Sequence, residues 1–343
     1  MAEQRIVIGN AMDVLRTLDE ESIDVCVTSP PYWSVRDYGT DPIVIGGDSE
    51  CEHDWDESNH CLKCCAWKGQ LGLEPDPLEY IEHLCVIFDE VKRVLKPTGS
   101  CGVNIGDTYA STVGGLYNGK KPEKIKDNTV KTAYSKDSYK KYGFRTKTMM
   151  QIPSRFAIAM TDHGWILRNE VIWHKPNVMP VSVTDRFTTD FEKFYFFTKE
   201  PNYYFKQIKE PMCEPTAKGT FGSRKRGNNN HSYSNNRYDP SAMGFERNAR
   251  TVWSIPTQGI SENHCAMYPL KLIDRPIRAC CPPGGIVLDP FCGSGTTLEY
   301  CRKHDVNGLG IELNTDFKDM IERRMMKDIG KIEDFATIDE KEK

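Results

Sequence analysis

One segment near the end of the chain constrains the fold more than any other: GIVLDPFCGSGTT, residues 285–297. An apolar run ends at Asp289, a turn contains Gly293 and Gly295, and Thr296 opens a helical pattern. A strand that leads through a glycine turn into a helix is the repeating unit of open α/β sheets, which bind ligands at the carboxyl ends of their strands. The segment therefore predicts a parallel sheet with a ligand site beside the two glycines.

Strand and helix patterns alternate at both ends of the chain. RIVIGN, AMDVLRTL and IDVCVT read as strand, helix and strand, and residues 77–95 place apolar side chains at helical spacing behind Pro77. Residues 165–175 and 191–199 predict two strands that can pair with each other. We therefore expect an α/β fold: one doubly wound, mostly parallel, Rossmann-like sheet in which the central loops are insertions.

The composition allows a large buried core and indicates a reducing compartment. The chain has 343 residues, 38% of them hydrophobic, and no apolar run approaches the roughly 20 residues that a membrane span requires. The start, MAEQRIVIGN, lacks a signal-peptide pattern, and most of the 13 cysteines lie in apolar segments such as HLCVIF, where free thiols are stable. We therefore expect a cytoplasmic protein without a membrane partner.

Two stretches are strongly basic, although the whole chain has a formal net charge of −4. Residues 118–147 contain ten Lys or Arg against three acidic residues, a net charge of +7. Residues 215–250 contain seven against two, a net charge of +5. Both stretches are rich in Gly, Asn, Ser and Tyr, which predicts loops. Such loops are either solvated surface insertions or a surface that binds a polyanion such as DNA.

A carboxylate follows the glycine turn at the spacing of a nucleoside site. Glu312 ends an apolar strand about 20 residues after Asp289, where a carboxylate can accept hydrogen bonds from ribose hydroxyls. The chain has no Gly-Lys-Ser/Thr sequence to bind phosphates, and the three-glycine dinucleotide fingerprint is incomplete. These features favour a cofactor without phosphates, S-adenosylmethionine. The alternative is an ordinary strand-to-helix turn that binds nothing.

Two motifs resemble those of a known family. DPFCGSGTT resembles the S-adenosylmethionine loop of DNA amino-methyltransferases, and TSPPYW, residues 28–33, resembles their catalytic loop. The catalytic loop comes first and the cofactor loop near the end, an order that resembles the permuted beta class of these enzymes. The likeness continues through VIWHKPN, RTVWSIPTQ and HCAMYP, and it is weakest over residues 110–150 and 215–245.

The resemblance implies which residues bind the cofactor. In such enzymes the segment similar to HCAMYP helps to enclose the methionine part of the cofactor. Asn10 departs from the family pattern, which has an acidic residue there to meet the adenine amino group, but an amide oxygen can also accept that hydrogen bond. The expected cofactor-binding residues are Asn10, Tyr268, Pro269, Asp289, Phe291, Gly293, Ser294, Gly295, Thr296 and Glu312.

The SPPY loop offers the parts that methylation of a base amine requires. The lone pair of this amine is delocalised into the ring, so the base must leave the duplex, be stacked, and have its amino hydrogens held. Ser29 and the carbonyl group of Pro30 can accept those two hydrogens. Pro31 stiffens the backbone, and Tyr32 offers a stacking face that Trp33 supports. The alternative is a polyproline-like surface turn.

The motifs restrict the target base without fixing it. A carbon-5 cytosine enzyme needs a cysteine nucleophile, commonly after a proline, and the chain has no Pro-Cys dipeptide. In the family that the loop resembles, Ser-Pro-Pro-Tyr is more often associated with cytosine-N4 and Asp-Pro-Pro-Tyr with adenine-N6. We therefore expect a DNA cytosine-N4 methyltransferase, with adenine-N6 as the alternative. Methylation of RNA or of a protein amide, and a DNA-binding module without catalysis, remain open as rivals.

A short cysteine-rich segment has the ligand types of a structural zinc site. A C-x-H pair followed by a C-x2-C pair offers four ligands for tetrahedral zinc, and this polar loop has few apolar residues to fold around. The expected ligands are Cys51, His53, Cys61 and Cys64, with His60 and Cys65 as rival ligands. A cysteine-rich loop without metal is the alternative.

These motifs divide the chain. Residues 1–176 and 251–330 are expected to form one methyltransferase domain, and residues 177–250 the target-recognition region. The expected insertions and tail are residues 48–70 (zinc-binding), 110–150 (basic and flexible) and 331–343 (charged). The expected DNA contacts are Trp33, Arg224, Lys225, Arg226 and Arg237. Duplex DNA and S-adenosylmethionine are the predicted partners, and a homodimer and a cognate restriction endonuclease are further candidates.

Overall fold

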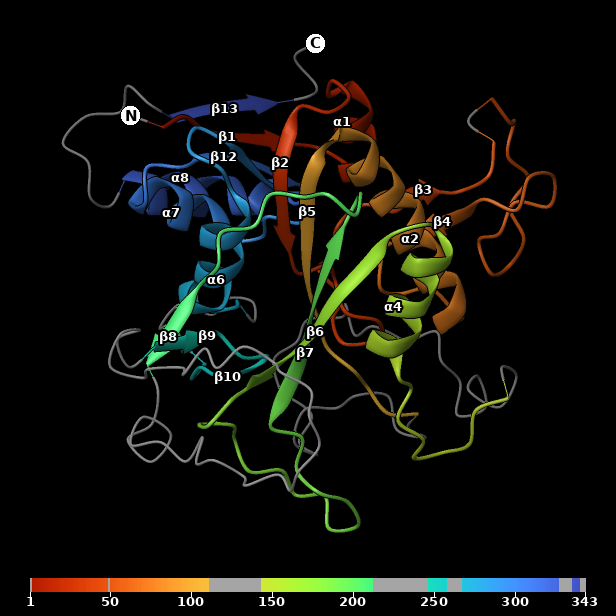
Figure 1. Cartoon of the computed structure of the whole chain (residues 1–343). Coiled ribbons are helices and arrows are strands. Elements are labelled where there is room, and N and C mark those ends of the chain that lie inside the picture. The colour runs from red at the N-terminus through yellow and green to blue at the C-terminus, as the bar shows by residue number, and fades with distance from the viewer. Residues whose placement is uncertain are drawn as a thin grey trace, which may run out of the picture.

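One nine-stranded sheet forms the centre of the molecule (Figure 1). The structure is a computed structural model that describes residues 2–48, 50–110, 143–211, 246–257, 267–326 and 335–339. The strands of the sheet, in spatial order, are β10 (Val252–Ser254), β6 (Ile166–His174), β7 (Phe191–Thr198), β5 (Leu95–Ile105), β2 (Ile23–Thr28), β11 (Ile286–Asp289), β12 (Asn307–Glu312), β1 (Gln4–Ile8) and β13 (Phe335–Asp339).

The sheet is mostly parallel, as the alternating pattern predicts. β7 runs antiparallel to its neighbours β5 and β6, and the other adjacent strands of this sheet pair in parallel. The two strands expected to pair, β6 and β7, do so along their whole length. Two short antiparallel pairs lie outside this sheet: β3 (Ile43–Ile45) with β4 (Trp67–Gly69), and β8 (Lys209–Pro211) with β9 (Glu246–Asn248).

The winding of the sheet reverses between β2 and β11. From β2 the chain passes through α2 (Pro77–Val94) to β5 on one side, and from β11 through α7 (Thr296–Lys303) to β12 on the other. β2 and β11 pair in parallel, so their carboxyl ends open at the same edge of the sheet, where open α/β sheets bind ligands. The SPPY loop follows β2 and the glycine turn follows β11, so the fold brings the two motifs together.

Helices cover both faces of the sheet (Figure 1). On one face lie α1 (Ala11–Thr17), α2 and α4 (Ile152–Asp162); on the other lie α6 (Leu270–Cys280), α7 and α8 (Lys318–Met326), which follows a 3-10 turn over Thr315–Phe317. α2 begins where the Asp76 carboxylate accepts a hydrogen bond from the Leu78 N–H group and Pro77 enters the first turn. Its apolar stripe, which includes Leu84 and Phe88, is fully buried and holds the helix on the sheet.

The expected charged tail, residues 331–343, contains a short strand. Residues 335–339 form β13, which pairs in parallel with β1 at the edge of the sheet. The sequence FATID carries Phe, Thr and Ile, which favour strands, and β1 offers an edge to pair with. Among the residues described, no helix is long and apolar enough to cross a bilayer.

Candidate active site

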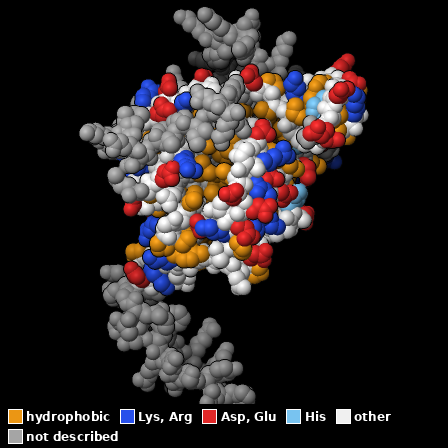
Figure 2. Space-filling model, turned by 90° about the horizontal axis from the view of Figure 1, so that it is seen from above, with side chains coloured by type: hydrophobic (Ala, Val, Ile, Leu, Met, Phe, Trp, Pro, Cys, Tyr) orange, Lys and Arg blue, Asp and Glu red, His pale blue; other side chains and the backbone are white. Residues whose placement is uncertain are grey.

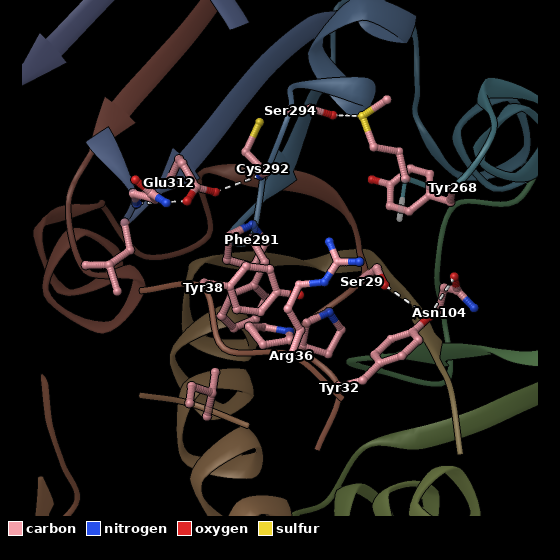
Figure 3. A pocket seen from close by; sticks show the side chains of 18 of the residues that line it. Ser29, Tyr32, Arg36, Tyr38, Asn104, Tyr268, Phe291, Cys292, Ser294 and Glu312 are labelled. Carbon is pink, nitrogen blue, oxygen red and sulfur yellow. Dashed lines mark hydrogen bonds between the residues drawn. The ribbon is translucent and has the colours of Figure 1, made fainter. Parts of the chain in front are cut away.

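A cavity of about 420 Å³ lies at the switch point between β2 and β11. In Figure 3, Ser29, Tyr32 and Asn104 lie on one side and Glu312 on the other, with Phe291 between them. The structure brings most of the predicted site residues to its lining, and these are Asn10, Ser29, Pro30, Pro31, Tyr32, Tyr268, Phe291, Gly293, Ser294, Thr296 and Glu312.

The Glu312 carboxylate lies on the side of this cavity away from Ser29 and Tyr32. It accepts hydrogen bonds from the backbone N–H groups of Gly293 (2.7 Å) and Asn314 (2.8 Å), which ties the end of β12 to the glycine turn. Burial raises the pKa of Glu312 to about 7, although these two N–H groups act in the opposite direction. The carboxyl group therefore changes charge near neutral pH.

The glycine turn leaves room for a ligand. Gly293 and Gly295 have φ angles of +54° and +82°, in the left-handed region that favours glycine. A Cβ atom on Gly293 would meet no atom closer than 4.0 Å and would project into open space beside the cavity. The open turn, the carboxylate and the cavity volume together fit an adenosine-bearing cofactor without phosphates, as S-adenosylmethionine is.

Asp289 lies beneath the cavity and does not line it. Its carboxylate is fully buried and accepts hydrogen bonds from the hydroxyl groups of Thr28 (2.6 Å), Tyr268 (2.9 Å) and Thr297. Burial raises its pKa, against the effect of these three donors. Thr28 ends β2 and Asp289 ends β11, so this carboxylate fastens the base of the SPPY loop to the base of the glycine turn. Pro269 and Gly295 also lie outside the cavity lining.

Asn10 lines the cavity and also caps a helix. Its Oδ1 atom accepts a hydrogen bond from the Met12 N–H group (3.0 Å) at the start of α1. An amide oxygen has two acceptor positions, so one remains for a ligand.

Tyr32 is held by its hydroxyl group at the other side of the cavity. The hydroxyl donates to Glu192 Oε2 (2.8 Å), lies 3.2 Å from Asn104 Oδ1, and accepts from Ser29 Oγ (3.3 Å). Burial, and next the negative charge of Glu192, raise the pKa of Tyr32 well above its usual range, so the hydroxyl stays protonated. A Cβ atom on Gly106 would lie 2.5 Å from the Tyr32 ring, so the ring needs a glycine at that position.

The backbone of the SPPY loop is fixed from below. The Tyr80 hydroxyl of α2 donates to the carbonyl group of Pro31 (2.7 Å). The Trp33 indole N–H donates to the carbonyl group of Glu74 (3.0 Å), and only 1% of the Trp33 side chain is exposed. Trp33 supports the loop from within the core, so the expected direct contact of Trp33 with DNA is wrong for this structure.

Among the polar lining residues that were missed in the sequence are Asn104, Lys175 and Glu192. Asn104 Nδ2 donates to Glu192 Oε2 (3.2 Å), and the Lys175 ammonium group pairs with Glu192 Oε1 while lying 4.5 Å from the centre of the Trp173 ring. Each lies at one end of a strand, and β7 brings Glu192 to this edge because it runs antiparallel. Only Lys175 had a signal in the sequence: it is the first residue after the strand predicted from VIWH, at the strand end where ligands bind.

The four expected metal ligands lie together. The ligand atoms of Cys51, His53, Cys61 and Cys64 all lie within 4.8 Å of one another. Two sulfur atoms, of Cys51 and Cys61, are 3.9 Å apart, and Cys64 Sγ is 3.4 Å from His53 Nδ1. Tetrahedral zinc bonds predict edges of about 3.8 Å between sulfur atoms and about 3.6 Å between sulfur and nitrogen. The donor set and its spacing therefore fit zinc.

The two rival ligands stand apart from this cluster. His60 Nε2 is 2.7 Å from Glu79 Oε1, and the Cys65 side chain is exposed.

The expected phosphate-contacting residues Arg224, Lys225, Arg226 and Arg237 lie outside the described residues, as does most of the basic stretch 118–147. On the face shown in Figure 2, acidic and basic side chains intermix. The two basic stretches therefore remain a prediction from the sequence.

Comparison with known proteins identifies the family. A family model described as DNA methylase (N6_N4_Mtase) matches residues 23–323. The chain is 33% identical over 325 residues to the type II methyltransferase M.SmaI from Serratia marcescens, covering 94% of this chain and 91% of the relative. It is 35% identical over 317 residues to the type II methyltransferase M.Cfr9I from Citrobacter freundii, covering 92% and 86%.

The fold agrees with this assignment. A protein from Thermus thermophilus, solved as a complex with S-adenosyl-L-methionine, superimposes with a TM-score of 0.56 at 20% identity and 98% coverage of both chains. The chain therefore belongs to the N6_N4 DNA methylase family and is an S-adenosylmethionine-dependent DNA amino-methyltransferase.

Proposed function

We propose that the enzyme methylates the exocyclic N4 amine of cytosine in duplex DNA, after the base has left the helix. The observation that carries the proposal is that residues 29–32 and the glycine turn share one cavity. A base bound against Ser29 and Tyr32 would therefore lie beside a cofactor bound against Gly293 and Glu312.

The residues of the SPPY loop hold the target amine. When bound, S-adenosylmethionine supplies a methyl group on a positively charged sulfur, which is already a good electrophile. Ser29 Oγ and the carbonyl group of Pro30 accept hydrogen bonds from the two amino hydrogens. This directs the nitrogen lone pair out of the plane of the ring, toward the cofactor side of the cavity. Once the nitrogen carries the methyl group, one of its two amino protons is released to solvent.

The surroundings of the loop support positioning rather than proton abstraction. The Tyr32 hydroxyl stays protonated and donates its hydrogen bond to Glu192, so it fixes the ring for stacking and does not act as a base. The Glu192 carboxylate is paired with Lys175 and accepts a hydrogen bond from Asn104, so both of its oxygens are held in place. The loop is thus preorganised before a base arrives.

On the cofactor side, we assign the ribose hydroxyls to Glu312 and the adenine amino group to the remaining acceptor position of Asn10. Phe291 offers a ring at the centre of the cavity, between Glu312 and Ser29 (Figure 3). Tyr268 lies against Asp289 and Thr297 and closes the side where the methionine part would lie.

The serine of the loop supports cytosine over adenine, since Ser-Pro-Pro-Tyr is more often associated with cytosine-N4 in the family that it resembles. Duplex DNA of varied sequence, incubated with the protein and methyl-labelled S-adenosylmethionine, can be digested to nucleosides and analysed by mass spectrometry. We expect labelled N4-methyldeoxycytidine. Labelled N6-methyldeoxyadenosine would keep the enzyme class and overturn the assignment of the base.

Two controls make this experiment specific. The Ser29→Ala variant should lose the label, which separates the enzyme from a contaminating methylase. RNA and a mixture of proteins, offered in place of DNA, should take none. Label in either of these but not in DNA would overturn the proposed substrate.

Target recognition and partners follow from the same assignment. We propose that residues 177–250 read the DNA sequence, with Arg224, Lys225, Arg226 and Arg237 contacting phosphates or guanine edges. The names of the type II relatives support a role beside a restriction endonuclease of the same specificity. A homodimer remains a candidate, and sedimentation equilibrium of the purified protein tests it.

We also propose that Cys51, His53, Cys61 and Cys64 bind one structural zinc ion. The support is the fit of their spacing to tetrahedral zinc. Atomic emission of the purified protein should give about one zinc per chain.

A further inference from the structure

The proposed zinc site lies in a short polar segment between two strands. The sulfur and nitrogen ligands come from residues 51–64, between the short strands β3 and β4, which lie beside α2 (Figure 1). The backbone hydrogen bonds described for this segment are local and stay within residues 48–68, among them Cys61 N to Ala66 O (2.7 Å) and Leu62 N to Asp54 O (2.8 Å). Four ligands on one ion would therefore fix a loop that its own apolar side chains cannot.

The last ligand, Cys64, lies three residues before β4. Gly47 has a φ angle of +71°, and a Cβ atom there would lie 2.5 Å from the Ala66 side chain and 2.8 Å from Cys64 Sγ. The backbone at Gly47 therefore packs against both Cys64 and Ala66, the residue that precedes Trp67. Movement of Cys64 would be transmitted to β4.

β4 leads directly into the wall of the active-site cavity. Gln70, one residue after β4, lines the cavity, and its Oε1 atom accepts hydrogen bonds from Tyr38 N (3.0 Å) and Thr40 Oγ1 (3.3 Å). Tyr38 and Thr40 line the same cavity. A single side chain beside the zinc segment therefore holds residues 38–40.

A second chain of contacts runs from β4 to the SPPY loop. The Trp67 ring stacks on the His83 ring of α2, with 5.7 Å between ring centres. His83 Nδ1 is 3.0 Å from the buried Glu74 carboxylate, and the other oxygen of Glu74 accepts from Gly72 N (2.8 Å).

The same residues reach the loop through their carbonyl groups. The Glu74 carbonyl accepts the Trp33 indole N–H (3.0 Å), and the Gly72 carbonyl accepts Ser34 N (2.8 Å). The backbone after the SPPY residues is therefore held by the segment that follows β4.

From these contacts we infer that zinc bound by Cys51, His53, Cys61 and Cys64 is a positioning device for the base-binding side of the active site. It fixes β4, and through Gln70 and Glu74 it fixes residues 31–40. The inference rests on the proposed site of methyl transfer. The role assigned to the ion is structural, since none of its four ligands lines the active-site cavity.

The test compares zinc-loaded and zinc-free protein by hydrogen–deuterium exchange, without DNA or cofactor. Zinc is removed by a chelator and then restored. We expect exchange in peptides covering residues 31–40 and 67–74 to become roughly tenfold faster or more without zinc, and to recover when zinc is restored. Peptides covering β11 and β12 should keep their protection, because a general loss of stability would accelerate exchange throughout the chain.

Matched variants identify the ligands. Cys64→Ser should lose the zinc and show the faster exchange, whereas Cys65→Ser, which changes the exposed neighbouring cysteine, should keep both zinc and protection. Cys64→His should restore zinc binding. Cobalt in place of zinc should give the visible absorption of a tetrahedral ion with thiolate ligands.

Each outcome decides one question. Purified protein that holds no zinc and takes up none would overturn the metal site. Stoichiometric zinc whose removal leaves residues 31–40 protected would overturn the positioning role. These readouts use neither DNA nor methyl transfer, so a failure to methylate DNA would contradict the proposed function and leave the zinc inference standing.

Discussion

Single residues set the geometry of the proposed base-binding side. Tyr32 is fixed by its hydroxyl group through Glu192 and Asn104, and its ring rests against Gly106. A stacking ring that is already oriented loses little further freedom when a base arrives, so more of the stacking energy is available for binding.

Replacing Tyr32 tests this role. Tyr32→Ala should lower kcat/KM for DNA by about 10- to 100-fold, because base–aromatic stacking contributes roughly 1–3 kcal/mol per base. Tyr32→Phe should lower it less, since the ring remains and only its anchor is lost. Both should bind S-adenosylmethionine as the wild type does, which isothermal titration calorimetry measures. An alanine variant with wild-type kcat/KM would exclude stacking on Tyr32.

If Glu312 binds the ribose hydroxyls as proposed, cofactor binding should depend on pH. Its pKa is raised to about 7 by burial, so below that pH it is mostly protonated and accepts poorly from ribose hydroxyls. The affinity for S-adenosylmethionine should therefore rise as the pH increases through about 7, and calorimetry between pH 6 and about pH 8 measures it. Glu312→Gln should bind more weakly, with a flat profile. An unchanged slope in this variant would assign the titration to another group.

The same carboxyl group affects stability in the opposite direction. Its pKa in the folded protein lies above the ordinary value of 4.5. The stability that it contributes is therefore complete below about pH 4.5 and is lost as the pH rises to about 7. A rise in pH through about 7 should therefore strengthen the proposed cofactor binding and reduce the stability that Glu312 contributes.

Among the elements, β2 and β11 depend on one shared carboxylate. The Asp289 side chain is fully buried. Its carboxylate accepts hydrogen bonds from the hydroxyl groups of Thr28, Tyr268 and Thr297. It joins the strand before the SPPY loop to the strand before the glycine turn. The distance between the two halves of the cavity therefore depends on this residue.

Asp289→Ala should lower the free energy of unfolding by about 3 kcal/mol or more, because each buried donor left without an acceptor costs roughly 1–3 kcal/mol. Asp289→Asn keeps an acceptor oxygen and should cost less. Urea unfolding followed by circular dichroism measures both. Equal effects of the two substitutions would show that the hydroxyl groups find other acceptors.

The elements also show why the site was only partly predictable from the sequence. The SPPY loop and the glycine turn are local patterns at strand ends, so their residues could be identified directly. Asn104 lies in β5, Glu192 lies in β7 and Lys175 follows β6, and only the antiparallel direction of β7 brings Glu192 to the same edge. That direction depends on tertiary packing, as does the edge of β1 on which β13 forms.

At the scale of the whole molecule, charge is distributed unevenly along the chain. The net charge is −4, yet residues 118–147 and 215–250 carry +7 and +5. With this charge distribution, the basic segments can bind DNA phosphates, while the acidic remainder of the chain is not attracted to DNA.

DNA affinity should therefore fall steeply with salt. Replacing Arg224, Lys225 and Arg226 together by Gln should reduce the slope of log K against log salt by about 2.7, since each phosphate contact contributes about 0.9. Fluorescence anisotropy over a series of salt concentrations measures the slope. A matched triple change at Lys318, Arg323 and Lys303, outside the two basic stretches, should leave the slope unchanged. An unchanged slope in the first variant would remove these residues from the DNA interface.

In the proposed site, the cavity has a cofactor side and a base side. Single-turnover methyl transfer by the Ser29→Ala variant is the most direct test of this division, with the affinity for S-adenosylmethionine measured on the same preparation. We predict wild-type affinity for S-adenosylmethionine and transfer slowed by about 100-fold or more, because one acceptor of the amino hydrogens is lost. Transfer at the wild-type rate, or a loss of cofactor binding as large as the loss of rate, would contradict this division.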